Sequence, residues 1–139
     1  MGVVVDASVC AKWLFAEEHQ AQALRLLVLG RRFHGPDLLV AEIGSITWKK
    51  CIRGSITPHQ AELVLATFRN APIDLTPTFE LARGTLAIGL DLRQSFYDCL
   101  YLALAQREQA QLVTADQRLR RKVAGTAYAA IILWIEDVP

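Results

Sequence analysis

Four carboxylates stand in apolar segments of the sequence, where a lone charge is costly. Asp6 follows the run VVV, Glu42 lies within LLVAEIGSI, Asp98 lies within SFYDCLYLALA, and Asp116 follows LVTA. A buried charge is expensive unless it is paired, hydrogen-bonded or bound to a metal. Each of these acids therefore needs a structural or a chemical explanation.

The chemical explanation is a divalent metal site. Four carboxylates in one place repel one another and raise one another's pKa unless a cation neutralises them. Carboxylate oxygens are hard ligands that suit Mg²⁺ or Mn²⁺. A divalent ion held there activates water and neutralises charge on a phosphate in the transition state. If the four acids meet, they predict hydrolysis of phosphodiester bonds.

Each acid also has a structural explanation. Asp6 and Asp116 each precede an expected helix and can cap it. Ser95 and Asp98 fit the S-x-x-D capping-box pattern, and Glu42 can lie at the edge of an apolar helix face. For any single acid, capping or packing is the better explanation. The occurrence of all four together favours function.

The elements that position these acids alternate between strands and helices. Strands are expected at residues 3–5, 73–75, 111–114 and 130–135 from their β-branched or apolar runs. Helical spacing of apolar residues follows Asp6, continues over 21–28 until Gly30, and resumes from Asp37 to Gly54. The pair Gly35-Pro36 is interpreted as a break between elements. In the helix after Asp37, the expected apolar face consists of Leu38, Ala41, Ser45 and Trp48.

Capping signals mark the later helices. Thr57, Pro58 and Gln60 form an N-cap, a first-turn proline and a capping box for a helix that runs to about Arg69. Residues 76–77, Thr-Pro, repeat the signal before a helix ending near Gly89. Ser95 opens a helix that is apolar nearly all round, as in a helix buried at the centre of a domain.

This alternation predicts an α/β sandwich with a mainly parallel sheet. The carboxyl ends of such strands face one crevice, so Asp6 and Asp116 are expected to meet there. Glu42 and Asp98 can reach the same crevice from helices. The length of 139 residues fits one domain, taken as residues 1–139.

Composition adds weaker constraints. The net charge of +1 gives no global attraction to nucleic acid, so any affinity for RNA must come from local clusters. The hydrophobic content of 53% exceeds the usual share of about 45 to 50%, which suggests surface covered by a partner. The three cysteines lack CxxC spacing and are interpreted as reduced core residues.

No membrane association is expected. The longest apolar run, residues 127–135, is too short to span a bilayer, and the start does not fit a signal peptide. We therefore expect a cytoplasmic protein.

Four segments together resemble the PIN family, and more closely its VapC-like toxins. They are VVVDASVCAKWLF, PDLLVAEIGSITWKKCIRGSIT, SFYDCLYLALA and LVTADQRL, in the family's order and over nearly the whole chain. The resemblance implies a three-layer α/β/α fold and a ribonuclease that uses Mg²⁺ or Mn²⁺. It also implies a cognate antitoxin as inhibitor, an RNA substrate and a homodimer.

The resemblance assigns roles to individual residues. The catalytic acids are Asp6, Glu42, Asp98 and Asp116, of which Asp6, Asp98 and Asp116 are expected to bind the metal. Ser8 and Thr114 are expected to support them, Thr114 by holding a water molecule or the last acid. Two positions depart from the family pattern: Ser45 replaces a frequent asparagine, and Cys99 replaces a small alanine. Neither departure removes a metal ligand.

Other residues are assigned more cautiously. Two basic clusters, Lys49, Lys50 and Arg53 after Glu42, and Arg118, Arg120, Arg121 and Lys122 after Asp116, either contact phosphate or form solvated helix faces. The three tryptophans are assigned to packing. The histidines have no ligand-like spacing, so no catalytic histidine is proposed.

Competing functions come from other classes. An enzyme with an aspartyl nucleophile needs a second aspartate two residues after Asp6, where Ser8 stands, and a receiver domain needs an acidic pair that is absent after residues 3–5. The stronger alternative is a catalytically weak domain that acts by binding RNA or antitoxin, with acids that serve structure.

Overall fold

The computed structural model describes residues 2–139, and five parallel strands form its central sheet. The strands are β1 (Val3–Val5), β2 (Phe33–Pro36), β3 (Ile73–Thr76), β4 (Leu112–Thr114) and β5 (Ile132–Trp134), arranged in the order β3-β2-β1-β4-β5. Val4 of the central strand pairs with His34 on one side and Leu112 on the other. The prediction of a mainly parallel sheet is confirmed.

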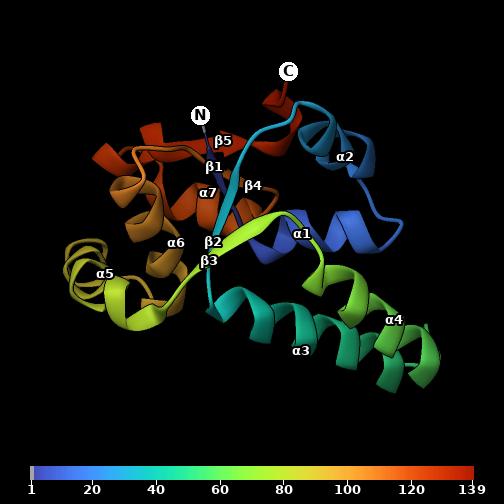
Figure 1. Cartoon of the computed structure of the whole chain (residues 1–139). Helices are drawn as coiled ribbons and strands as arrows, with labels where there is room; N and C mark the ends of the chain where they lie inside the picture. The colour runs from blue at the N-terminus through green and yellow to red at the C-terminus, as the bar shows by residue number, and fades with distance from the viewer. Residues whose placement is uncertain (1) are drawn as a thin grey trace.

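Helices cover both faces of this sheet (Figure 1). They are α1 (Ala7–Leu14), α2 (Gln20–Val28), α3 (Leu38–Ile52), α4 (Pro58–Arg69), α5 (Thr78–Leu92), α6 (Phe96–Arg107) and α7 (Gln117–Val123). In Figure 1, α5 and α6 lie to the left of the strands, α1, α2 and α4 lie to the right, and α3 runs below them toward the right. The three-layer α/β/α arrangement is therefore confirmed. Within residues 2–139, every helix is too short or too polar to span a bilayer.

The core lies where α6 packs on the middle of the sheet. All seven residues of 99–105 are buried, as the apolar pattern around this helix predicts. Val4 and Val5 are fully buried, and so are Leu112 and Val113 beside them. Cys10 and Cys99 are buried free thiols, as expected, whereas Cys51 is half-buried.

The strand β2 was missed by the sequence analysis, which interpreted Gly35-Pro36 as a break. Proline ends this short strand, and a Cβ at residue 35 would lie 2.8 Å from Leu39 Cδ2, so a larger residue there would displace that side chain. The expected final strand is also shorter than predicted. Residues Ala127–Ile131 form the 3-10 turn η1 before β5, and a second turn, η2 (Ile135–Asp137), follows it.

The helix start at residues 76–77 was assigned to the wrong residues. Thr76 ends β3 and Pro77 is the N-cap, while the Thr78 amide donates to Asp37 Oδ1 at 3.1 Å. The helix also passes Gly89 and ends at Leu92, where Arg93 adopts a left-handed backbone with φ of 54°. By contrast, the predicted cap, proline and capping box at residues 57–60 are all confirmed.

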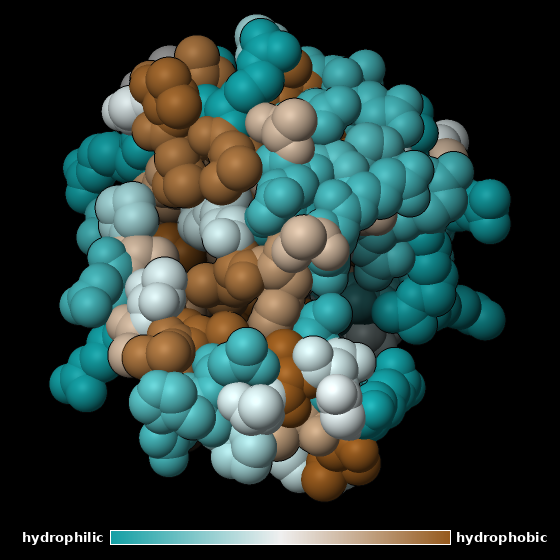
Figure 2. All heavy atoms as spheres, turned by 90° about the vertical axis from the view of Figure 1, so that its right-hand side faces the viewer, coloured by the Kyte–Doolittle hydropathy of each residue, from teal (hydrophilic) through white to brown (hydrophobic). Residues whose placement is uncertain are grey.

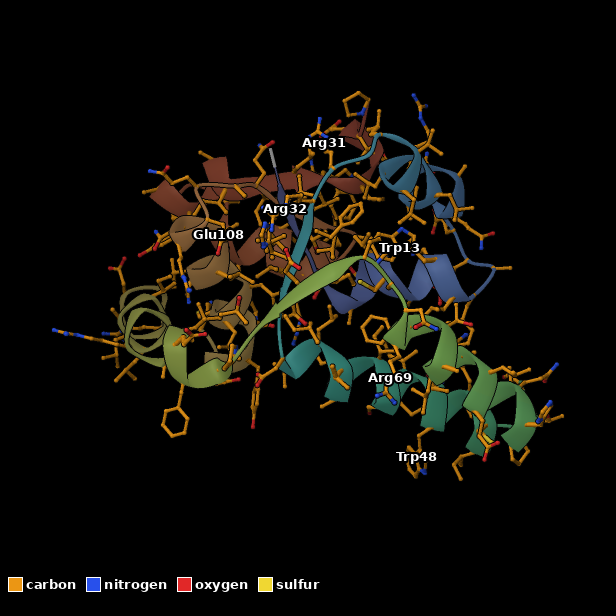
Figure 3. The ribbon with its side chains drawn as sticks, viewed as in Figure 1. Trp13, Arg31, Arg32, Trp48, Arg69 and Glu108 are labelled. Carbon is orange, nitrogen blue, oxygen red and sulfur yellow. The ribbon has the colours of Figure 1, made fainter. Side chains whose placement is uncertain are left out.

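The predicted buried face of α3 was wrong. Leu39, Ile43 and Thr47 face the core, whereas Ser45 and Trp48 are exposed. Trp48 is 61% exposed and points away from the fold (Figure 3), so its assignment to packing is corrected. Trp13 does pack, in a T-shaped contact with Phe33 at a distance of 5.1 Å between ring centroids.

Candidate active site

A small pocket of about 60 Å³ collects all four predicted acids at the carboxyl ends of the central strands. They come from four places in the chain: just past the ends of β1 and β4, the second turn of α3 and the first turn of α6. The lining residues are Asp6, Ala7, Ser8, Glu42, Asp98, Tyr101, Asp116 and Leu119. The pocket therefore brings together acids up to 110 positions apart, from 6 to 116.

Asp6 is the most buried of these acids, with only 6% of its surface exposed. It caps α1, because its Oδ1 accepts from the Val9 amide at 3.1 Å and from Ser8 Oγ at 2.5 Å. Its Oδ2 accepts from the Thr114 hydroxyl. Burial, with a smaller contribution from the charge of Asp116, raises the pKa of Asp6 to about 6, although these hydrogen bonds lower it.

Ser8 and Thr114 join the ends of β1 and β4 through their hydroxyls. Ser8 Oγ accepts from the Ala115 amide at 2.9 Å while it donates to Asp6. Thr114 Oγ1 accepts from the Asp116 amide at 3.0 Å while it donates to Asp6. Thr114 thus contacts the carboxylate of Asp6 and the backbone of Asp116. These bonds hold the two strand-end acids in a fixed relation.

Asp116 caps α7 and lines the pocket at once. Its Oδ1 accepts from the Arg118 amide at 3.0 Å and from the Leu119 amide at 3.3 Å. Within residues 2–139, no hydrogen bond uses Oδ2, which leaves that oxygen available to a ligand. Capping and a chemical role are therefore compatible for this residue.

Glu42 lies half-buried on α3 and accepts a hydrogen bond from the hydroxyl of Tyr101 at Oε1. Burial raises the pKa of Glu42, the Tyr101 bond lowers it, and the charges of Asp98 and Asp116 raise it. Burial and the Glu42 charge also raise the pKa of Tyr101, so its hydroxyl stays protonated as a donor.

Tyr101 was missed by the sequence analysis. The available signal was its spacing, since it follows Asp98 by three residues on α6 and so lies on the same helix face. Nothing in the sequence indicated its contact with Glu42, which lies 59 positions away.

Asp98 faces cations of α7. Ser95 caps α6 by accepting from the Asp98 amide at 3.2 Å, as its S-x-x-D pattern predicts. The Asp98 carboxylate lies 3.2 Å from Lys122 Nζ through Oδ2 and 3.7 Å from Arg118 Nη2 through Oδ1. The basic residues of α7 thus include two that are directed at the acidic pocket.

The donor set fits a hard divalent cation. Within residues 2–139, no three acidic, histidine or cysteine side chains are grouped closely enough to hold an ion by themselves. Mg²⁺ usually takes one or two protein carboxylates and completes its shell with water and substrate phosphate. The unengaged Oδ2 of Asp116 and a pocket of about 60 Å³ beside it suit that mode of binding.

Comparison with known proteins identifies the family. The family model for the PIN domain matches residues 3–124. The chain belongs to the PIN family. Among its relatives, ribonuclease VapC9 of Mycobacterium tuberculosis is 34% identical over 84% of this chain and 87% of that protein. Ribonuclease VapC3 of Pyrobaculum aerophilum is 29% identical over 88% of this chain and 95% of that protein.

The fold of this PIN domain also matches solved structures. The toxin–antitoxin complex from Klebsiella pneumoniae superposes with a TM-score of 0.61 at 15% identity. The match covers 95% of this chain and 96% of that chain. At this identity the likeness establishes the fold alone. Of the two departures from the family pattern, Ser45 is exposed and outside the pocket lining, and Cys99 is buried in the core.

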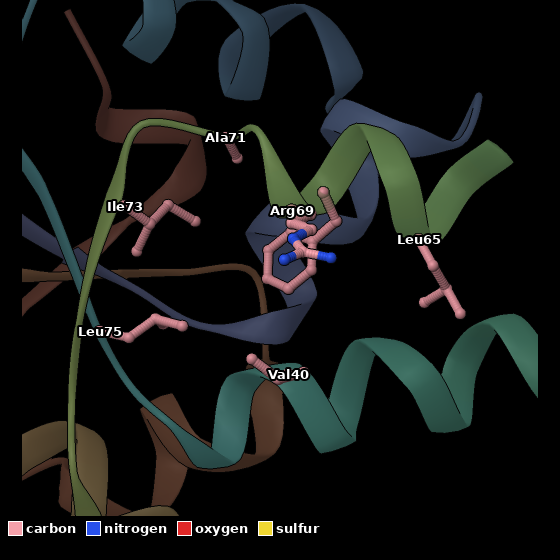
Figure 4. A pocket seen from close by; sticks show the side chains of 7 residues that line it. Val40, Leu65, Arg69, Ala71, Ile73 and Leu75 are labelled. Atoms are coloured by element: carbon pink, nitrogen blue, oxygen red, sulfur yellow. The ribbon is translucent and has the colours of Figure 1, made fainter. Parts of the chain in front are cut away.

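A second hollow of this PIN domain is apolar. It measures about 400 Å³ and lies between α3, α4 and the edge strand β3 (Figure 4). Its lining residues are Val40, Leu65, Phe68, Arg69, Ala71, Ile73 and Leu75. Viewed from the side of α3 and α4, the surface shows brown apolar areas beside a broad teal region (Figure 2). We call this hollow the apolar groove.

Proposed function

We propose that this PIN domain is a metal-dependent endoribonuclease and the toxin of a toxin–antitoxin pair. The observation that carries the proposal is the meeting of Asp6, Glu42, Asp98 and Asp116 in one small pocket. Relatives that match most of the chain are named ribonucleases. Four acids from separate elements have no common structural need to face one another, because each cap requires only its own helix.

Asp6, Asp98 and Asp116 would bind Mg²⁺ or Mn²⁺ together with water and substrate phosphate, since the acids are not grouped closely enough within residues 2–139 to hold an ion by themselves. When bound, a divalent ion lowers the pKa of water and offsets charge on the phosphate undergoing substitution. Asp6 is oriented for this task by Ser8 and Thr114, which fix both of its oxygens. A fixed first ligand limits the rearrangement that binding requires.

Glu42 would accept the proton of the attacking water and then donate it to the leaving oxygen. Its Oε1 is held by Tyr101, and its raised pKa brings it nearer the range in which a carboxyl accepts and returns protons. A proton taken from the attacking water would reside on Oε2 and pass to the leaving oxygen. Lys122 and Arg118 add positive charge on the side of Asp98.

Cleavage of end-labelled total RNA tests the proposal. Antitoxin-free protein is incubated with Mg²⁺, Mn²⁺ or EDTA, beside Asp98→Asn and the control Glu62→Gln, which changes an exposed acid on α4. We expect cuts that need the metal, persist in the control and disappear in Asp98→Asn with unchanged circular dichroism. Cutting by Asp98→Asn at the wild-type rate would contradict the assignment.

A binding domain with structural acids is the second candidate. The caps made by Asp6 on α1 and Asp116 on α7 favour it, because both acids serve the fold. Under this alternative, Asp98→Asn leaves RNA processing and growth inhibition unchanged. Loss of either, with folding intact, would exclude it.

An antitoxin and a second copy of this chain are the proposed partners. The neighbour in a toxin–antitoxin complex supports the first, and exposed apolar residues such as Val40 and Leu65 support a covering partner. Co-expression with the product of the adjacent reading frame should yield a complex that no longer cleaves RNA. Light scattering should give the mass of a dimer for the isolated protein, and a monomer would contradict that assignment.

We also propose that residues 1–139 form one domain, although the family model matches only 3–124. The support is β5, beyond that match, which pairs with β4 from Leu112 to Thr114 and so completes the sheet. Limited proteolysis should therefore release no stable fragment that ends near residue 124.

A further inference from the structure

The carboxylate of Asp98 is already neutralised by this chain. Lys122 Nζ lies 3.2 Å from Oδ2, close enough for a charge-assisted hydrogen bond, and Arg118 is more distant at 3.7 Å. The side chains of Lys122 and Asp98 are only 25% and 18% exposed, whereas that of Arg118 is 68% exposed. Lys122 is therefore the principal and the better shielded counter-ion of Asp98.

The other cations of α7 are directed elsewhere. The Arg120 guanidinium lies 4.7 Å from the ring centroid of Trp134, and Arg121 is exposed and makes no ion pair within residues 2–139. One short helix thus carries a cation aimed at the pocket and, one position before it, a cation of equal charge in solvent. Comparing variants of Lys122 and Arg121 therefore distinguishes a local role of Lys122 from a general effect of positive charge.

An ammonium and a divalent ion at Asp98 Oδ2 oppose each other's binding. They compete for the same electron pairs and repel each other. Lysine suits an exchangeable contact, because its charge is compact and its stem has four rotatable carbons. Once displaced, the ammonium stays attached to α7 beside the pocket, where a phosphate that approaches the metal would meet it.

We propose that Lys122 is the resident counter-ion of Asp98, displaced when a divalent ion binds and then used to position the RNA phosphate. This inference rests on the proposed function, which supplies the metal and the RNA. It makes Lys122 a positioning residue that opposes metal binding and favours substrate binding. The two effects have opposite signs, which a residue that only stabilises the fold would not produce.

Titration calorimetry with Mn²⁺ tests the first effect without any RNA. We expect Lys122→Gln to bind Mn²⁺ about tenfold more tightly than wild type, because one cation within a few ångströms of the ion is removed. The matched variant Arg121→Gln should shift affinity by less than about twofold, because its charge is screened by solvent. Equal shifts in the two variants, or weaker binding by Lys122→Gln, would overturn the proposal.

Steady-state cleavage of a fluorescein-labelled single-stranded RNA at saturating Mn²⁺ tests the second effect. Lys122→Gln should raise KM several-fold and change kcat little, and Lys122→Arg should restore KM. An unchanged KM would overturn the phosphate role. If no variant or wild type cleaves RNA, the proposed function fails while the calorimetric result still decides the competition for Asp98. Thermal unfolding in EDTA checks that each variant is folded.

Discussion

The acidic pocket and the apolar groove differ in how their residues affect the free energy of folding. The pocket, about 60 Å³, is built from charges held by hydroxyls, helix ends and two cations. The groove, about 400 Å³, is lined mainly by apolar side chains and one arginine. Burial of Asp6 opposes folding at neutral pH, as its raised pKa indicates. The groove rests on Phe68, whose burial favours folding.

The two regions are suited to different ligands: the pocket to a cation and the groove to a partner that covers apolar side chains. In the pocket, polar bonds fix acids in positions that only a cation compensates fully. In the groove, exposed apolar side chains such as Val40 and Leu65 keep contact with water until a partner covers them. We therefore expect changes in the pocket to act on chemistry and pH dependence, and changes in the groove to act on stability or association.

The largest effect is expected for Phe68→Ala, beneath the groove. Phe68 is 8% exposed and its loss leaves a cavity, so the free energy of unfolding should fall by about 3 kcal/mol. Urea unfolding followed by circular dichroism measures this change. The control Phe79→Ala removes a side chain that is 96% exposed and should change stability little. A loss of stability in Phe68→Ala as small as that in Phe79→Ala would show that Phe68 is not a core residue.

The second effect concerns the pH dependence of stability in EDTA. Folding raises the pKa of Asp6 from 3.8 to about 6. Protonation of this carboxyl therefore stabilises the folded protein relative to the unfolded chain. That contribution is fully present below pH 3.8 and is lost as pH rises through 6. At pH 7, Asp6→Asn should therefore be more stable than wild type by on the order of 2 kcal/mol.

Urea unfolding at several pH values between 4 and 7 measures this difference, which should shrink toward the acidic end. Saturating Mn²⁺ should reduce it, because an ion that binds the folded protein stabilises wild type selectively. A wild-type protein more stable than Asp6→Asn at pH 7 in EDTA would mean that the hydrogen bonds of Asp6 outweigh its burial.

Much of the pocket was predictable from the sequence, because the strand ends and helix caps that form it depend on neighbouring residues in the chain. The strand ends at Asp6 and Asp116 follow from buried β-branched runs, and parallel strands bring such ends to one edge. The caps at Thr57 and Ser95 were also predictable from their own neighbours. Local chemistry sufficed in each case.

Contacts between distant elements escaped the sequence analysis. The bonds of Tyr101 with Glu42 and of Lys122 with Asp98 depend on how α6 packs against α3 and α7. In α3, both Leu39 and Trp48 are apolar, and only the packed structure shows which of them faces the core. The strand β2 could not be predicted from strand propensity, because glycine and proline are depleted in strands, and the close approach of Leu39 to Gly35 appears only in the packed structure.

A smaller effect on activity is expected for Tyr101→Phe. Glu42 loses the hydrogen bond that lowers its pKa, so the acidic limb of the pH–rate profile should move to higher pH. The value of kcat/KM at neutral pH should fall about tenfold, as for loss of a residue that orients another. Rates of RNA cleavage across pH measure both. An unchanged profile would place Tyr101 outside the reaction.

The smallest effect on stability is expected for Leu65→Ser at the edge of the groove. Leu65 is 44% exposed, so the free energy of unfolding should change by no more than about 0.5 kcal/mol. RNA cleavage should also be unchanged, because none of the residues that line the acidic pocket belongs to the groove. If Leu65→Ser abolished cleavage while the protein stayed folded, the groove would belong to the substrate site. The two regions would then have to be treated as one extended RNA surface.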